Sequence, residues 1–174
     1  MTKKIYLSLG SNLNDRERNL LLAIKKINEL CGTVVEVSSL YQTGPWGMQN
    51  QPEFLNQVIE IESDFSPHEL LQKVLVIEKE MGRKPAPRWG PRVIDIDILF
   101  FDQEILSEED LVIPHVGIPH RRFALLPLSE IAPDYVHPLV NKTIRELLDE
   151  CTDPLQAELY IPKNSWPLPP ALFF

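Results

Sequence analysis

Short runs of apolar residues alternate along the chain with longer stretches in which apolar residues recur every three or four positions. The short runs are typical of strands, and the spaced stretches are typical of amphipathic helices. The predicted strands cover residues 5–9, 33–41, 54–62 and 93–101. The predicted helices cover residues 15–31, 122–131 and 143–151, together with one that follows a Ser66 cap and ends before Gly82. This order is typical of a ferredoxin-like α+β fold, so we expect a mainly antiparallel sheet with helices packed on one face.

The end of the chain departs from this pattern. Residues 155–174 contain four prolines and finish in an apolar run, which predicts an irregular tail. We therefore expect one domain over residues 1–151 and a Pro-rich apolar tail over residues 152–174. The apolar side chains of this tail are costly to leave in water, so we expect it to pack on the protein surface or on a second copy, in weak self-association. We expect the tail to serve stability or association, and not chemistry. Its apolar side chains are Trp166, Leu168, Leu172, Phe173 and Phe174.

The overall charge argues against general nucleic-acid binding. The 174 residues include 17 Lys and Arg against 25 Asp and Glu, a formal charge of -8, which repels a phosphate backbone over most of the surface. Cys31 and Cys151 have no metal or disulfide spacing, and we expect both to be buried. No signal peptide or membrane-length apolar run is visible. The sequence therefore predicts a cytoplasmic protein that binds small molecules and has neither nucleic-acid nor membrane partners.

Two carboxylates interrupt the most apolar predicted strand. Asp95 and Asp97 are two residues apart in Ile94-Asp95-Ile96-Asp97-Ile98, so on a strand they share one face while the isoleucines take the other. Paired carboxylates need compensating positive charge, which Mg²⁺ supplies, and two such ions could be bridged by this pair while they hold a polyphosphate. The alternatives are a solvent-facing pair or an ion pair with Arg92.

A basic loop precedes the two aspartates. Residues 83–92 contain three prolines, one glycine and Trp89, and the cations are Arg83, Lys84, Arg88 and Arg92. Arginine binds phosphate oxygens in bidentate fashion, so the acidic pair and the loop together favour phosphoryl-type transfer. The common nucleotide-binding signatures are absent from the sequence. A solvated charge run is the alternative, but a tryptophan in such a loop is better explained by a ligand that it covers.

These residues carry a resemblance to a known family. The string Arg88-Trp89-Gly90-Pro91-Arg92-Val93-Ile94-Asp95-Ile96-Asp97-Ile98, with Gly10-Ser11-Asn12-Leu13, Tyr41-Gln42-Thr43, Gln51-Pro52-Glu53-Phe54-Leu55-Asn56, Ile77-Glu78 and Gly82-Arg83, resembles the 6-hydroxymethyl-7,8-dihydropterin pyrophosphokinases of folate biosynthesis. The match runs from the N-terminus to about Leu148. It implies a ferredoxin-like fold, ATP as co-substrate, two Mg²⁺ ions, and transfer of the β,γ-diphosphoryl unit to the pterin hydroxymethyl oxygen with release of AMP.

The resemblance also implies roles for single residues, with Asp95 and Asp97 as ligands of both metal ions. The catalytic residues it implies are Arg83, Arg92, Asp95 and Asp97. The implied ATP-binding residues are Leu71, Glu78, Lys84, Arg88, Trp89, Arg92, Ile98, Leu111, His115 and Arg121. The implied pterin-binding residues are Thr43, Gly44, Pro45, Trp46, Phe54, Asn56, Asp95 and Phe123. Phe54 and Phe123 would stack on the two faces of the pterin, and Asn56 would hydrogen-bond its edge.

Some positions depart from the family pattern. Leu75 and Val116 replace a glutamine and an aromatic residue, and the basic loop is one residue shorter, with Lys84 near its second arginine position. Gly44 replaces a proline and Trp46 a smaller apolar residue, so we expect the pterin-side loop to close differently. A pterin- or nucleotide-binding module without catalysis and a metal-dependent phosphohydrolase remain as alternatives. Formation of AMP together with a pterin diphosphate separates the three.

Overall fold

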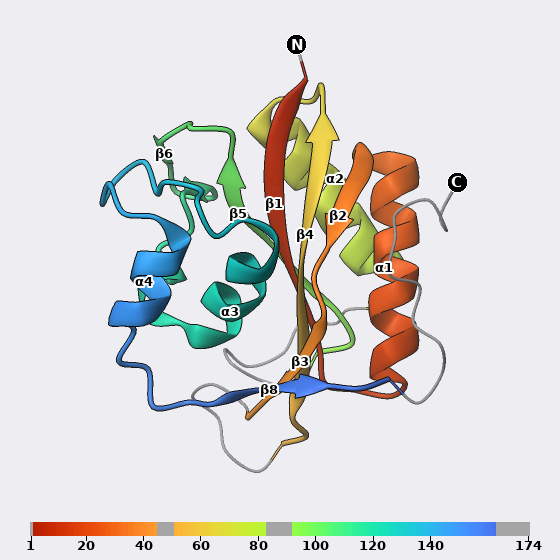
Figure 1. Cartoon of the computed structure of the whole chain (residues 1–174). Helices are drawn as coiled ribbons and strands as arrows, with labels where there is room; N and C mark the ends of the chain where they lie inside the picture. Colours follow the sequence, from red (N-terminus) through yellow and green to blue (C-terminus); the bar gives the residue numbers. More distant parts are fainter. Residues whose placement is uncertain (1, 45–50, 83–91, 163–174) are drawn as a thin grey trace.

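The computed structural model describes residues 2–44, 51–82 and 92–162. In this part of the chain, antiparallel strands form a six-stranded sheet in the order β5-β1-β4-β3-β8, with β2 also paired to β4 (Figure 1). The strands of this sheet are β1 (Lys3–Ser11), β2 (Thr33–Val37), β3 (Leu40–Thr43), β4 (Phe54–Ser63), β5 (Asp95–Phe101) and β8 (Ala157–Tyr160). Strands β6 (Leu106–Ser107) and β7 (Val112–Ile113) pair separately. The predicted ferredoxin-like α+β fold with an antiparallel sheet is confirmed.

Helices cover both faces of the sheet, so the prediction that they pack on one face is wrong. Helices α1 (Arg16–Leu30) and α2 (Pro67–Glu80) cover one face, while α3 (Arg122–Ile131) and α4 (Ile144–Glu150) lie on the other (Figure 1). The central strands explain this arrangement, because β4 is buried at nearly every position rather than at alternate ones. Ile5 and Leu7 of β1 belong to the core beneath α1 and α2, whereas Tyr6 belongs to the core beneath α3.

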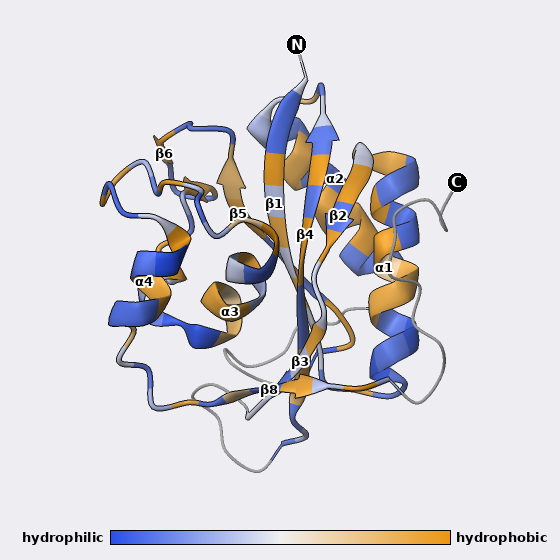
Figure 2. Ribbon diagram, viewed as in Figure 1, coloured by the Kyte–Doolittle hydropathy of each residue, from blue (hydrophilic) through white to orange (hydrophobic). Residues whose placement is uncertain are grey.

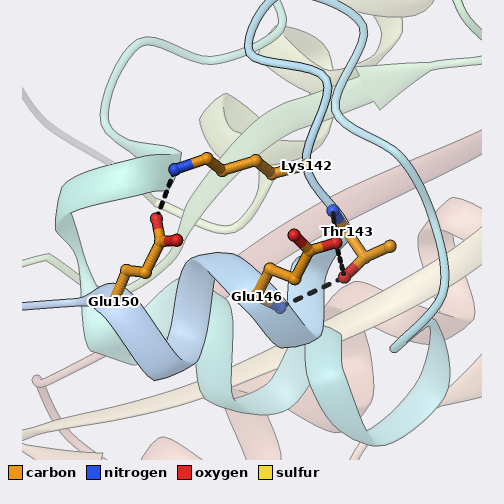
Figure 3. Close-up of polar contacts among 4 residues, drawn as sticks. All are labelled: Lys142, Thr143, Glu146 and Glu150. Atoms are coloured by element: carbon orange, nitrogen blue, oxygen red, sulfur yellow. Dashed lines mark hydrogen bonds and ion pairs between the residues drawn. The ribbon is translucent and has the colours of Figure 1, made fainter.

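Local signals set the helix starts where the sequence places them. Ser66 and Glu69 form a reciprocal capping box at the start of α2, which satisfies two backbone donors that the first turn leaves unpaired. Thr143 and Glu146 form the same motif at α4, with a Lys142–Glu150 ion pair beside it (Figure 3). Apolar stripes on the helices face the sheet (Figure 2), as the spacing of apolar residues predicts. No helix in the described ranges is long and apolar enough to cross a membrane.

The predicted strand over residues 33–41 is divided into β2 and β3 at Ser38 and Ser39. The Ser38 hydroxyl accepts a hydrogen bond from Val58 N and donates one to Ser39 O, at 3.0 and 2.8 Å. Both strands pair with β4 on either side of this break. Side-chain hydrogen bonds of serine to nearby backbone compete with the strand ladder, so the break follows from residue type.

The prediction of an irregular tail is wrong for Ala157–Tyr160, which form strand β8 along the free edge of β3. Edge strands present unpaired N–H and C=O groups that favour the addition of a further strand, and β8 meets that need. The predicted packing of Trp166, Leu168, Leu172, Phe173 and Phe174 lies outside the described residues. The division into residues 1–151 and 152–174 stays a prediction.

Candidate active site

Three neighbouring strands bring the candidate site residues together at the end of the sheet where β1 ends and β4 and β5 begin (Figure 1). Gly10 of β1 is paired with Asn56 on one side and with Asp95 on the other. Ser8 of β1 is paired with Asp97. Directly paired residues of antiparallel strands project to the same face, so the two aspartates and Asn56 share the face of the sheet that α3 also covers.

The shared face of Asp95 and Asp97 agrees with the sequence prediction. Both are half-buried, while Ile94, Ile96 and Ile98 are buried in the core on the opposite face. The residues paired with Asp95 and Asp97 on β1, which are Gly10 and Ser8, are small. Two carboxylates on one face of a strand fit the preference of Mg²⁺ for oxygen ligands, with water and phosphate completing its shell.

A buried carboxylate on α2 supports the strand that carries the aspartates. Glu78 is only 4% exposed, and its Oε2 accepts a hydrogen bond from Ile96 N at 2.9 Å. Because β5 is an edge strand, this N–H has no ladder partner and would be costly to bury alone. Glu78 therefore fixes the backbone midway between Asp95 and Asp97, a role that its predicted place beside the nucleotide did not include.

A β-bulge in β5 positions His115. Leu7 is paired with Ile98 but Tyr6 with Phe100, so Leu99 is the extra residue. The carbonyl of Leu99 accepts a hydrogen bond from His115 N at 3.0 Å. Bulges redirect the strand and free backbone groups for other partners. The irregularity thus anchors His115 beside the strand of the two aspartates.

The surroundings of His115 define its protonation. Burial, followed by the nearby Arg121 guanidinium, lowers the pKa of His115, and Asp95 opposes this shift. The ring is therefore neutral near pH 7, and its Nδ1 accepts a hydrogen bond from Gly117 N at 3.1 Å. Its proton consequently lies on Nε2, which can donate a hydrogen bond to an anionic oxygen. Arg121 also lies 5.9 Å from the ring centre of Phe123, so these three predicted residues lie together.

The predicted pterin residues meet at the neighbouring end of β3 and β4. Asn56 is buried, and its Nδ2 donates to Thr43 Oγ1 at 2.6 Å. A β-carbon built on Gly10 would lie 3.0 Å from Asn56 Oδ1 and 3.6 Å from the Phe54 ring. Gly10 therefore allows the amide and the ring to pack across β1. Phe54 and Phe123 are both half-buried, so each retains surface that a flat ligand could cover.

Asn12 was not among the predicted site residues, although it is part of the Gly10-Ser11-Asn12-Leu13 motif. Asn12 accepts a hydrogen bond from Arg92 N at 2.7 Å and donates one to Pro52 O at 3.0 Å. Asn12 is 1% exposed. It joins the end of the basic loop to the segment that leads into Phe54. An asparagine in a turn after a strand is the sequence signal, but its partners are distant in the chain.

Several predicted ATP neighbours are apolar and lie in the main core. Ile98 and Leu111 are buried there, and Leu71 packs against it from α2. Their contact with a nucleotide stays a prediction. The replacements Leu75 and Val116 are exposed. Six predicted site residues lie outside the described residues, and they are Pro45, Trp46, Arg83, Lys84, Arg88 and Trp89.

Comparison with known proteins places this geometry in a family. The family model described as 7,8-dihydro-6-hydroxymethylpterin-pyrophosphokinase matches residues 6–133. The pyrophosphokinase named 2-amino-4-hydroxy-6-hydroxymethyldihydropteridine pyrophosphokinase from Aquifex aeolicus is 41% identical over 85% of this chain and 92% of its own length. The enzyme of the same name from Haemophilus influenzae is 43% identical over 85% of this chain and 92% of its own length.

Solved structures agree on the fold. The crystal structure of Plasmodium falciparum HPPK-DHPS with pteroate superposes with a TM-score of 0.70 at 20% identity, over 86% of this chain. The present chain spans 42% of that longer protein. A structural match at 20% identity supports the fold alone. The family model and the bacterial relatives match the sequence itself and support membership of the family. On these findings the chain belongs to the 7,8-dihydro-6-hydroxymethylpterin-pyrophosphokinase family.

Proposed function

We propose that this protein transfers the diphosphoryl group of ATP to the hydroxymethyl oxygen of 6-hydroxymethyl-7,8-dihydropterin, giving the pterin diphosphate and AMP. The observation that carries the proposal is the shared sheet face of Asp95, Asp97 and Asn56. This face joins a carboxylate pair suited to cations with an amide suited to the edge of a heterocycle. Family membership supports the same reaction.

Asp95 and Asp97 would hold two Mg²⁺ ions through their carboxylate oxygens. When bound, these ions neutralise phosphate charge and polarise the transferred group. Glu78 keeps the two carboxylates at a constant separation by holding Ile96 N. In this arrangement the protein contributes position and charge, and no side chain is needed as a nucleophile.

The basic residues would bind the polyphosphate. His115 would donate from Nε2, and Arg121 beside it would pair with phosphate oxygens in bidentate geometry. Asn12 holds the backbone of Arg92. Arg92 and Arg83 would stabilise the negative charge that develops on the transferred group. Lys84, Arg88 and Trp89 are assigned to the same nucleotide by the resemblance, together with Leu71, Glu78, Ile98 and Leu111.

The pterin would bind at the other end of the shared face. Asn56 Nδ2 donates a hydrogen bond to Thr43 Oγ1, and the amide of Asn56 would pair with the edge of the ring. Phe54 and Phe123 would stack on the ring, at about 1 kcal/mol per stacked pair beyond the area they bury. Backbone groups of residues 43–46 would pair with the remaining edge, and Asp95 would lie near the hydroxymethyl group.

The test is a product assay with ATP, Mg²⁺ and the reduced pterin. Equal amounts of AMP and pterin diphosphate are expected. A binding module would form neither product, and a phosphohydrolase would cleave ATP without a pterin adduct. Either result would exclude the proposed reaction. A cytoplasmic location, and partners that are small molecules without nucleic acid or membrane, are also part of this proposal. Sedimentation of the full chain tests the proposed self-association through the tail.

A further inference from the structure

The segment after α4 contacts two parts of the chain that carry described pterin residues, the start of α3 and the end of β3, and reaches a third, the start of β4, through Arg16. We call residues 151–160 the C-terminal clamp. The clamp follows the last residue that the family model matches, which is residue 133. Figure 1 shows it running from α4 past the start of α3 and along β3 toward the first turn of α1.

The first contact holds the start of α3, next to Phe123. Asp153 Oδ2 accepts a hydrogen bond from Arg122 N at 3.0 Å, although no side chain of α3 itself caps this end. The Arg122 guanidinium donates in return to the carbonyls of Asp153 and Cys151, at 3.3 and 3.2 Å. Asp153 is 6% exposed. A buried carboxylate at a helix N-terminus satisfies an orphan donor and the positive end of the helix dipole.

The second contact holds the end of β3. Strand β8 is paired with β3, and Ala157 lies opposite Thr43. Asp153 Oδ1 also accepts from Leu155 N at 3.0 Å, which turns the chain toward this strand. Leu155 Cδ1 lies 3.5 Å from the position of a β-carbon on Gly44, an ordinary packing distance. The clamp therefore contacts the strand end from which the pterin-side loop departs.

The third contact reaches the residue before Phe54. Tyr160 Oη donates to Glu17 at 2.7 Å, and the Arg16 guanidinium lies 5.6 Å from the Tyr160 ring centre. Arg16 Nη1 donates to the carbonyl of Glu53 at 2.8 Å. Tyr160 thus acts on the start of β4 through Arg16.

We infer that the C-terminal clamp is a positioning element for the pterin, with Asp153 as its central residue, because it holds the segments of Phe123, Thr43 and Phe54 in one arrangement. The inference rests on the proposed function. Residues that contact neither substrate can alter binding when they set the spacing of those that do. On the ATP side of the site, His115 and Asp97 have no contact with the clamp among those described above, and Arg121 is linked to it only as the residue before Arg122.

Steady-state kinetics of the full chain test this role. Asp153→Ala should raise KM for the pterin by about ten-fold, as for the loss of a charged hydrogen-bonding partner, and should raise KM for ATP by a smaller factor, because only Arg121, which begins the same helix, connects the clamp to ATP. Asp153→Asn, which keeps one acceptor oxygen, should raise KM for the pterin less than Asp153→Ala does. Glu158→Ala is the matched control, because Glu158 is exposed on β8 and should behave as wild type. An unchanged pterin KM, or an equal rise in both KM values, would overturn the inference.

Hydrogen exchange separates the clamp from the reaction. Amides of residues 40–44 and 121–125 should exchange faster in Asp153→Ala, while those of β1 stay protected. Unchanged exchange would overturn the clamp even in an active enzyme. A wild-type protein that forms no pterin diphosphate would instead refute the proposed function. If Asp153→Ala does not fold, Tyr160→Phe provides the test. Its KM for the pterin should be about three-fold higher, because one hydrogen bond is lost. A wild-type KM for the pterin would overturn the clamp.

Discussion

The side chain of Arg121 lies against the bare α-carbon of Gly117. A β-carbon on Gly117 would lie 2.8 Å from Arg121 Nε and 2.9 Å from Cζ, closer than real side chains approach. Gly117 has a φ of -80°, which any residue can adopt, so space and not backbone conformation requires the glycine here. Gly117 thereby allows Arg121 to lie beside His115.

Gly117→Ala is therefore expected to displace Arg121 and weaken ATP binding. KM for ATP should rise by about ten-fold, as for one impaired charged hydrogen bond. The free energy of unfolding should change by less than about 1 kcal/mol, because a flexible side chain can move aside. Kinetics and thermal melting measure the two effects.

The double variant Gly117→Ala/Arg121→Ala provides the control. If the alanine acts through Arg121, the double variant should bind ATP no worse than Arg121→Ala alone. Additive losses would show that Gly117 affects ATP by another route.

Asp95→Ala and Asp97→Ala should each lower turnover by at least about 100-fold, because each removes a ligand of ions that stabilise transferred charge by several kcal/mol. Melting of the metal-free variants should occur at or above the wild-type temperature, since carboxylate repulsion is relieved. Glu62→Gln, at an exposed position on β4, is the control. Near-normal turnover of either aspartate variant at saturating Mg²⁺ would contradict the metal assignment.

Glu78 should act through the backbone of β5. Glu78→Gln keeps an oxygen for Ile96 N and should retain most turnover. Glu78→Ala leaves that buried N–H unsatisfied, at a cost of about 1–3 kcal/mol in unfolding free energy, and should lower turnover with it. Urea unfolding and the product assay compare the two variants. Equal behaviour of glutamine and alanine would argue that the charge of Glu78, and not its hydrogen bond, matters.

Asn12→Ala should affect both substrates, because Asn12 joins Arg92 to the segment before Phe54. It removes a buried acceptor and a buried donor, so we expect a loss of about 1–3 kcal/mol in stability. KM should rise for ATP and for the pterin together. A rise in KM for one substrate only would show that just one of the two hydrogen bonds, to Arg92 N or to Pro52 O, matters for binding.

The two cysteines should differ in reactivity. Burial raises the pKa of the Cys31 thiol to about 11, so little thiolate is present at pH 8, and reagent access is blocked as well. The prediction that both cysteines are buried holds for Cys31, whereas Cys151 is half-buried. A thiol-specific chromogenic reagent should therefore modify one cysteine in the native protein and two in denaturant. Rapid modification of both in the native state would contradict this expectation.

The sequence alone determined most of the helices and strands and the face that the two aspartates share. Period-two and period-3.6 patterns are local properties, so the helices, most of the strands and the shared face of Asp95 and Asp97 follow from residue order. The capping box at Ser66 is equally local. The motif from Arg88 to Ile98 is distinctive enough to indicate the family from the sequence alone.

Tertiary structure decided which distant residues meet. The bulge at Leu99, the tie between Asn12 and Arg92, and the cap that Asp153 provides for α3 all depend on pairing across large sequence separations, which periodicity does not encode. Helices cover both faces because β4 is buried on both, and β8 forms because β3 would otherwise leave its backbone groups unpaired. Residue types set the interactions that each side chain can make. Packing of the backbone sets which partners each side chain meets.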